Sequence, residues 1–262
     1  MHIVVLTKPV PDPAAAAERL GPDHRLDRAA SPSVVNGNDE YALEAALKLA
    51  DSLGGEVSLL TMSPASGADT MRKALAMGAA RGTLVTDPAL AGSDTWSTTQ
   101  VLAAALRGMT FDLVLAGVDT SDGVGGVVAS GIAALLRLPY LGNAAKIEPD
   151  VAAGTVRVRR ITPSGYDVLE APMPALVVCT QALGEPRYPS LKGIMGARTK
   201  EITTQSLADL GLDAGTLGGA NALTAVQATK RPPARDATKV VRGSAEEGAA
   251  AIVELLTARR II

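Results

Sequence analysis

The sequence predicts an α/β protein built on a parallel, twisted sheet with helices on both faces. Two observations carry this prediction. Short runs rich in β-branched residues alternate with segments of about 10–15 residues whose apolar positions recur at helical spacing. The short runs are mostly apolar rather than regularly alternating, which is typical of parallel strands covered on both faces. A late β-hairpin and a C-terminal arm ending in a helix complete the expected fold.

The elements of the first half follow from local pattern. "IVVLT" (Ile3–Thr7) predicts a buried strand, and "NDEYALEAALKLADSLGG" (Asn38–Gly55) predicts a helix that ends at its two glycines. Ser93 or Asp94 is a suitable N-cap for a third helix. Further strands are expected at Glu56–Met62, Thr83–Asp87 and Phe111–Gly117, and further helices at Gly67–Gly82, Thr95–Met109 and Gly126–Leu138.

The pattern changes after Pro139. "TVRVRRI" and "YDVLEA" flank a turn at Pro163–Gly165 and predict a hairpin, and "PALVVCT" (Pro174–Thr180) predicts one more buried strand. Residues 181–244 have no sustained period, and a final amphipathic helix is expected over about Ala245–Arg260. Such a long irregular stretch is unusual inside a compact domain, so we expect a domain over residues 1–184 and an arm over 185–262 that lies on another molecule.

Composition excludes several classes of function. The chain has 262 residues, a net charge of -2, one cysteine and two histidines. An internal disulfide and a conventional zinc site are therefore not expected, and the single Cys179 fits a reducing bacterial cytoplasm. No run of eighteen apolar residues predicts a membrane span. The near-neutral charge and scarce aromatic residues argue against nucleic-acid binding.

A glycine-rich turn carries the most informative local chemistry. In "LVLAGVDTSDGVGGVVASG" (Leu113–Gly131) a buried strand is followed by a polar turn and by a helix expected to begin near Val124–Gly126. Free amides at a helix N-terminus suit a phosphate, and ligands of open α/β sheets bind beyond the carboxyl ends of strands. The turn lacks both the P-loop ending and a complete G-x-G-x-x-G pattern. A nucleotide site and a plain strand-to-helix turn both remain open on the residues alone.

Other polar positions favour structural roles. Asn36, Asn38 and Asp39 precede the first long helix, and capping that helix is favoured over contact with a ribose or base. Lys8 and Asp12 follow the first strand and favour a solvated loop. Cys179 is expected to be buried and inert. No catalytic motif is present, so the sequence predicts a protein that binds and positions rather than an enzyme.

The stretch "EPRYPSLKGIMGARTKEI" (Glu185–Ile202) mixes apolar and basic residues after the last regular strand. The residues alone favour an apolar loop packed on its own domain. The order and spacing of "VVLTKPVPD", "NDEYALEAALKLAD", "RKALAMGAARG", "LVLAGVDTSDGVGG" and this stretch, however, resemble the β subunit of electron transfer flavoproteins over nearly the whole chain.

The resemblance implies an αβ heterodimer with a core like that of adenine-nucleotide α-hydrolases and universal stress proteins. Such proteins accept electrons from flavin dehydrogenases, such as acyl-CoA dehydrogenases of fatty acid oxidation, and pass them towards a membrane quinone oxidoreductase. The α subunit holds most of one FAD, whose ring lies near the β subunit, and the β subunit holds a structural AMP. In a bifurcating branch a second FAD takes the AMP position.

Carried over residue by residue, the resemblance implies an AMP shell. Its members would be Leu6, Asn36, Gly37, Asn38, Asp39, Met62, Gly117, Val118, Asp119, Thr120, Ser121, Asp122, Gly123, Val124, Gly125, Gly126, Val127 and Val128. The amides of residues 123–128 would hold the phosphate, and Leu6 and Met62 would flank the adenine.

The resemblance also gives Glu185–Ile202 a role as the loop that docks dehydrogenases. Leu191 would enter a pocket on the partner, flanked by Ile194 and Met195. The basic residues Lys192, Arg198 and Lys200 would steer acidic partner surfaces.

Three departures from the family pattern suggest a paralogue with its own dehydrogenase. A carboxylate that would help hold the FAD domain is replaced by Ile161, an aromatic near the flavin is replaced by Asn38, and an aspartate is replaced by Ala80. The alternatives are a stand-alone adenine-nucleotide sensor resembling universal stress proteins, and a bifurcating flavoprotein with FAD in the β site.

Overall fold

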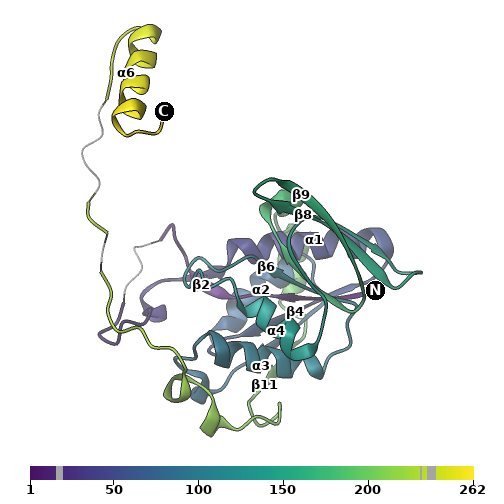
Figure 1. Ribbon diagram of the computed structural model, residues 1–262. Coiled ribbons are helices and arrows are strands. Elements are labelled where there is room, and N and C mark those ends of the chain that lie inside the picture. The colour runs from purple at the N-terminus through teal and green to yellow at the C-terminus, as the bar shows by residue number, and fades with distance from the viewer. Residues whose placement is uncertain (16–19, 231, 235–239) are drawn as a thin grey trace. The chain divides into compact units, whose positions relative to one another are not determined.

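The computed structural model describes residues 1–15, 20–230, 232–234 and 240–262. Contacts divide the chain into two units, Met1–Gln227 and Ala228–Ile262 (Figure 1). Part of the expected linker, residues 231 and 235–239, lies outside the described residues.

The first unit is built on a nine-stranded sheet with the order β11-β5-β4-β1-β6-β10-β7-β8-β9. The seven strands from β11 to β7 are parallel, and β8 and β9 continue the sheet antiparallel. The strands are β1 (His2–Leu6), β4 (Glu56–Met62), β5 (Arg81–Val85), β6 (Leu113–Gly117), β7 (Tyr140–Asp150), β8 (Thr155–Thr162), β9 (Gly165–Pro172), β10 (Ala175–Cys179) and β11 (Ile202–Gln205). A small separate sheet pairs β2 (Pro9–Pro11) with β3 (Ser33–Val35).

Helices cover both faces of the parallel part, as the sequence predicts. They are α1 (Gly37–Leu53), α2 (Gly67–Met77), α3 (Thr95–Arg107), α4 (Val128–Leu136) and α5 (Leu191–Ala197). Because side chains of a strand alternate between faces, Ile3 and Val5 pack with α1 and α2, whereas Val4 and Leu6 pack with α3 and α4. The result is two buried apolar layers separated by the sheet.

Two helix boundaries differ from the prediction for a clear backbone reason. Helix α2 ends at Met77 rather than Gly82, because Gly78 takes φ 146°, which a right-handed helix cannot contain; β5 therefore starts at Arg81. Helix α4 begins at Val128 rather than near Val124–Gly126, because Val124 (φ 46°) and Gly126 (φ 63°) adopt left-handed conformations.

The predicted hairpin is confirmed as β8 and β9, but its neighbour β7 was not predicted. β7 contains Gly142, Pro149 and Asn143, the last with φ 55°, and the β10–β7 and β7–β8 registers are both irregular. These residues are depleted in strands, so the strand carries little local signal.

The compact unit extends past the predicted boundary at residue 184, because β11 pairs in parallel with the edge strand β5. Short 3-10 helices η2 (Pro88–Leu90), η4 (Ala214–Thr216) and η5 (Gly219–Asn221) also belong to this unit, as do η1 (Arg28–Ala30) and η3 (Gln181–Leu183).

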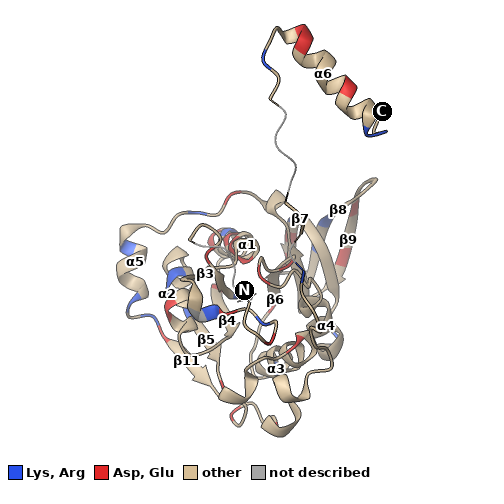
Figure 2. Cartoon of the chain, turned by 90° about the vertical axis from the view of Figure 1, so that its left-hand side faces the viewer, with Lys and Arg blue, Asp and Glu red and all other residues tan. Residues whose placement is uncertain are grey.

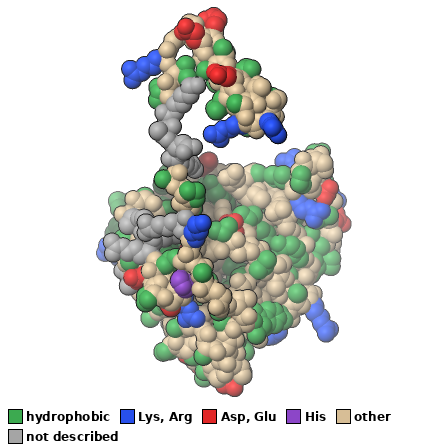
Figure 3. Space-filling model, turned by 60° about the vertical axis from the view of Figure 1, so that its left-hand side comes forward, with side chains coloured by type: hydrophobic (Ala, Val, Ile, Leu, Met, Phe, Trp, Pro, Cys, Tyr) green, Lys and Arg blue, Asp and Glu red, His purple; other side chains and the backbone are tan. Residues whose placement is uncertain are grey.

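The second unit contains α6 (Ala245–Ala258), which confirms the predicted terminal helix. A capping box between Ser244 and Glu247 fixes its start. None of its residues is buried within this chain, and Figure 3 shows hydrophobic side chains exposed on it. No helix among the described residues is long and apolar enough to cross a membrane.

Candidate functional site

A cavity of about 170 Å³ opens beyond the carboxyl ends of β1 and β6, beside the first turns of α3 and α4. In the sheet, β1 lies between β4 and β6. The strands that follow β1 in the chain, β4 and β5, extend the sheet on one side of β1, whereas β6 adds to the sheet on its other side. In open α/β sheets ligands bind at such a reversal of strand order. The residues that line the cavity are Leu6, Thr7, Lys8, Asp39, Leu60, Thr95, Leu102, Ala116, Gly117, Val118, Asp119, Thr120, Gly123, Gly125, Gly126, Val128 and Ala129.

The glycine-rich turn forms one wall of this cavity. At Gly117 a Cβ would lie 2.6 Å from the Asn38 carbonyl carbon, so only glycine lets the end of β6 approach the first turn of α1. At Gly125 a Cβ would meet only Thr95 Oγ1, at 3.9 Å, so protein packing does not demand glycine there. The missing side chain instead keeps the cavity open.

The backbone amides beside this wall differ in availability. Val124 N–H donates to the Thr120 carbonyl at 2.7 Å, so the prediction that this amide is free for a phosphate is wrong. The first-turn amides of α4 begin at Val128 and have no intrahelical acceptor, and the helix dipole adds positive potential there. This end of the cavity therefore suits an anion.

The favoured capping role of Asn36 and Asn38 is wrong. Asn36 stands at the N-cap of α1, but its side chain makes no capping bond. Its Nδ2 donates to the Asp119 carbonyl at 2.8 Å, and its Oδ1 accepts from Ser121 N–H at 3.2 Å. Asn38 Nδ2 donates to Asp119 Oδ1 at 2.6 Å. The two asparagines thus fix the turn after β6 against α1.

Asp39 is the buried carboxyl group of the site, with 5% of its surface exposed. Its Oδ2 accepts the Lys8 amide at 2.9 Å. Burial raises the pKa of Asp39 to about 7, although hydrogen bonds from Asn36 and from the amides of Lys8 and Gly117 act in the opposite direction. The carboxyl group joins the ends of β1 and β6 to the start of α1.

A three-residue ion cluster meets the cavity at Lys8, the member of the cluster that lines it. Asp122, whose side chain is 1% exposed, accepts from Lys8 Nζ at 2.8 Å and from Arg28 Nη2 at 2.6 Å. Burial acts to raise the pKa of Asp122, but the bonds and charges of Lys8 and Arg28 outweigh it and lower the pKa to about 2. Lys8 thus lies at the site, and the expectation of a solvated loop is wrong. Its position directly after β1 was the available signal.

The cavity brings together ten of the predicted shell residues, namely Leu6, Asp39, Gly117, Val118, Asp119, Thr120, Gly123, Gly125, Gly126 and Val128. Asn36, Gly37, Asn38, Met62, Ser121, Asp122, Val124 and Val127 do not line it. In place of Met62, Leu60 of the same strand does. Besides Lys8, sequence reasoning missed five residues that have no distinctive local signal. Thr7 follows β1, Ala116 lies in β6, and the others belong to α3 (Thr95, Leu102) and α4 (Ala129).

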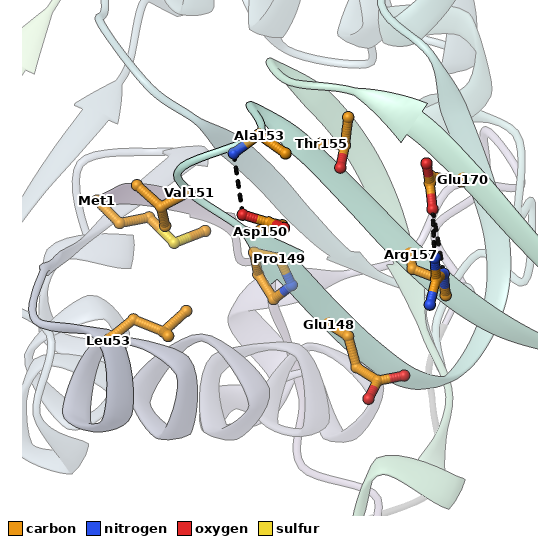
Figure 4. A pocket seen from close by; sticks show the side chains of 10 residues that line it. All are labelled: Met1, Leu53, Glu148, Pro149, Asp150, Val151, Ala153, Thr155, Arg157 and Glu170. Carbon is orange, nitrogen blue, oxygen red and sulfur yellow. Dashed lines mark hydrogen bonds and ion pairs between the residues drawn. The ribbon is translucent and has the colours of Figure 1, made fainter.

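A larger hollow of about 630 Å³ lies between the end of α1 and the β7–β8 turn (Figure 4). Its polar groups are already paired: Arg157 bonds Glu170 twice, at 3.1 and 2.8 Å, and Asp150 accepts the Ala153 amide. The hollow therefore offers a ligand few unsatisfied polar groups, and the smaller cavity is the candidate site.

The docking segment folds as helix α5, which lies beside α2 (Figure 2). Leu191 is 75% exposed, and Ile194 and Met195 are exposed as well. Tyr188, which the sequence reasoning left out, is exposed on the same segment. These side chains are therefore not packed into their own domain, contrary to what the residues alone favoured.

Clamps on both sides hold α5 in place. Arg187 pairs with buried Glu44 at 2.7 Å and with Asp51 at 3.0 Å on α1. Lys200 Nζ donates to the carbonyls of Leu75 and Ala79, 2.9 and 2.7 Å away, at the C-terminal end of α2. Lys200 thus has a structural role, and its part in steering an acidic partner stays a prediction. Lys192 and Arg198 remain exposed.

The departures from the family pattern fall at defined places. Ile161 is 46% exposed and lies opposite Tyr166 in the hairpin. The adjacent Arg160 pairs with Asp167 at 2.5 Å within the same hairpin. The side-chain amide of Asn38 is hydrogen-bonded to Asp119. Cys179, which is not one of these departures, is fully buried, as expected.

Comparison with known proteins adds a family. The model of the electron transfer flavoprotein domain matches residues 24–210. The electron transfer flavoprotein subunit beta of Mycobacterium tuberculosis is 38% identical over 100% of this chain and 99% of its own length. The subunit of the same name from Thermoanaerobacterium thermosaccharolyticum is 35% identical over 100% of both chains. Protein FixA of Bradyrhizobium diazoefficiens is 36% identical over 98% of this chain and 91% of its own length.

Proposed function

Because this chain belongs to the electron transfer flavoprotein family as a β subunit, a carrier component and not an enzyme, we propose that it pairs with an α subunit and holds an AMP in the cavity beyond β1 and β6. Its proposed role is electron transfer from flavin dehydrogenases towards a membrane quinone oxidoreductase. The observation that carries the AMP assignment is the meeting of α4 first-turn amides with a glycine-lined cavity at the reversal of strand order.

The residues present fit a mononucleotide. Leu6, Leu102 and Ala129 give the cavity an apolar wall for a base. The amides from Val128 onward and the ammonium group of Lys8 offer positive charge for one phosphate. Lys8 is 36% exposed and shares Asp122 with Arg28, so its charge is only partly neutralised. Asp119 and Thr120 supply polar groups that suit ribose hydroxyls.

FAD, which the family implies, supplies the electron-accepting chemistry when it is bound. This chain's proposed part is to border the flavin and to keep the AMP site closed and rigid. Asn36, Asn38 and Asp39 perform the second task, because they fix the end of β6 and the following turn against α1. AMP is thus a structural ligand buried against a preformed scaffold.

The exposed face of α5 is proposed to dock the dehydrogenase. Leu191 would bury its side chain in a pocket of the partner, with Ile194, Met195 and Tyr188 around it. Burial of one leucine is worth about 1.5–3 kcal/mol. That amount suits a contact that must release between electron transfers.

Co-purification tests the proposal. The chain would be co-expressed with an electron transfer flavoprotein α subunit from the same organism, and nucleotides would be extracted from the complex and counted. We expect one FAD and one AMP per heterodimer. A complex without flavin absorbance would overturn the carrier role. Two flavins and no AMP would favour the bifurcating alternative, and a monomeric, ATP-responsive chain would favour the sensor.

A further inference from the structure

Asp94 stands at an unusual junction in the first unit. As the N-cap of α3, its Oδ1 accepts the Ser97 amide at 2.9 Å. Its other oxygen, Oδ2, accepts the amides of Leu223 and Thr224 at 2.8 and 3.1 Å, and the Thr224 hydroxyl at 3.2 Å. One carboxylate thus joins the start of a core helix to a segment 129 residues later in the chain.

The late segment runs along the loop that precedes α3. The Leu207 amide donates to Asp87 at 3.3 Å, and the Gly219 amide donates to the Ala91 carbonyl at 3.0 Å. A Cβ at Gly218 would lie 1.8 Å from the Ala89 carbonyl oxygen, so the two stretches touch directly. The hydrogen bonds from Leu223 and Thr224 to Asp94 are the last of these contacts along the chain.

Beyond Thr224, no hydrogen bond attaches the remaining described residues of the first unit to the rest of that unit. Of its described residues 225–227, none makes a hydrogen bond, and the unit ends at Gln227. The Leu223 side chain is 75% exposed, so the attachment is made through its backbone amide and not through packing. Asp94 therefore fixes the point at which the arm leaves the compact unit.

We propose that Asp94 is the positioning residue for the C-terminal arm, fixing the origin from which residues 228–262 reach the partner subunit. The inference rests on the proposed heterodimer for its function, but the hold itself is a property of this chain. Holding residues 223 and 224 in place before the partner binds lowers the ordering cost of assembly at the start of the arm. The electrostatics agree: burial acts to raise the pKa of Asp94, but the amides of Ser97, Thr224 and Leu223 outweigh it and lower the pKa, so the carboxylate is ionised and its bonds are charge-assisted.

Asp94→Asn separates the two roles of the residue. An asparagine retains one acceptor oxygen for the Ser97 amide and remains a good N-cap, but its NH₂ group would face the Leu223 and Thr224 amides. Asp94→Ala removes both roles. Asp213→Asn is the matched control, because Asp213 caps η4 through the Gly215 amide within its own turn.

Hydrogen exchange on the full chain, read by mass spectrometry, provides the test. In Asp94→Asn we expect the peptide of residues 221–227 to exchange about tenfold faster or more at the two amides that Asp94 holds, those of Leu223 and Thr224, with no change in β1 and β6. Asp213→Asn should leave 221–227 as in the wild type. Equal exchange of 221–227 in the wild type and in both Asp94 variants would overturn the proposal.

Reconstitution with the α subunit tests the consequence. The Asp94→Asn heterodimer should dissociate faster than the wild type and the Asp213→Asn control. Equal dissociation rates would remove the assembly role. If the wild-type chain forms no flavin-containing heterodimer at all, the proposed function fails, whereas the exchange experiment still decides whether Asp94 holds the arm.

Discussion

At the scale of single residues, the turn after β6 contains strain. Val124 is β-branched and has φ 46°, a region that such residues avoid because the branched Cβ crowds the backbone. Strain of this kind persists where the surroundings hold it, and here Val124 N–H is held by the Thr120 carbonyl at 2.7 Å. The strained turn lies beside the cavity, and backbone strain of this kind is typically found at functional sites.

Replacing Val124 should relieve that strain. Val124→Gly is expected to raise the free energy of unfolding by about 1 kcal/mol, measured by urea denaturation. Val151 is the matched control, because it is also an exposed valine in a turn but is not among the residues with positive φ. Val151→Gly should destabilise by about 0.5–1 kcal/mol, because glycine loses more conformational freedom on folding. Equal destabilisation by both changes would contradict the strain.

Asp39 makes stability depend on pH. Its pKa is about 7 in the folded chain and 3.8 ordinarily, so between these values the folded state keeps a proton that the unfolded chain has released. Stability should therefore fall as the pH rises from about 4 to about 7, by up to about 4 kcal/mol. Asp39→Asn should remove this component. The measurement is the wild-type minus variant difference in unfolding free energy at several pH values, and a difference independent of pH would refute the prediction.

At the scale of elements, α5 is a short helix made rigid by its neighbours. Seven residues are too few for a stable isolated helix. The Arg187–Glu44 pair holds the chain before α5. At its other end, Arg72 Nη1 donates to the carbonyl of Ala197, its last residue, at 2.7 Å and to the Lys200 carbonyl at 2.5 Å. The apolar face of α5 is thus presented without the ordering cost that a flexible loop would pay on binding.

Truncation of that face tests its role. Leu191→Ala should weaken docking of the dehydrogenase about 10- to 100-fold, measured as the dependence of the electron-transfer rate on partner concentration, with FAD and AMP content unchanged. Leu53→Ala removes the same atoms from an exposed position at the end of α1 and should have no effect. Identical rates for Leu191→Ala and the wild type would remove the anchor assignment.

At the scale of the whole molecule, the hydrophobic core lies entirely within the first unit. Every buried apolar residue among those described lies at or before Leu217. Helix α6 buries nothing within this chain, yet it exposes Ile252, Val253 and Leu255. A helix with this composition gains stability by packing elsewhere, which the proposed α subunit would provide.

Ending the chain at Gln227 should therefore leave the first unit folded. We expect its free energy of unfolding to change by less than about 0.5 kcal/mol, measured by urea denaturation. The same truncation should abolish or greatly weaken co-purification with the α subunit. A truncated chain without a cooperative transition would show that the second unit contributes to the core.

The parallel core could be predicted from the sequence, because a continuous apolar run such as Ile3–Leu6 in β1 and the helical spacing in α1 are local signals. The sequence also indicated the turn after β6, because a dense cluster of glycines has few structural uses. Strand β7 could not be predicted in this way, because Gly142 and Pro149 have low strand propensity. Pairing with its neighbours β10 and β8 stabilises this strand.

The roles of the polar residues became clear from the three-dimensional contacts alone. Asn36 and Asn38 have the sequence signature of caps, yet they bind Asp119, which is more than eighty residues away in the chain. Lys8 and Arg28 both pair with Asp122. Lys200 donates to a backbone carbonyl just beyond the end of α2, and Asp94 accepts the Leu223 amide. The physical reason is that a hydrogen bond depends on where side chains meet in space, whereas burial of an apolar face is already encoded in local spacing.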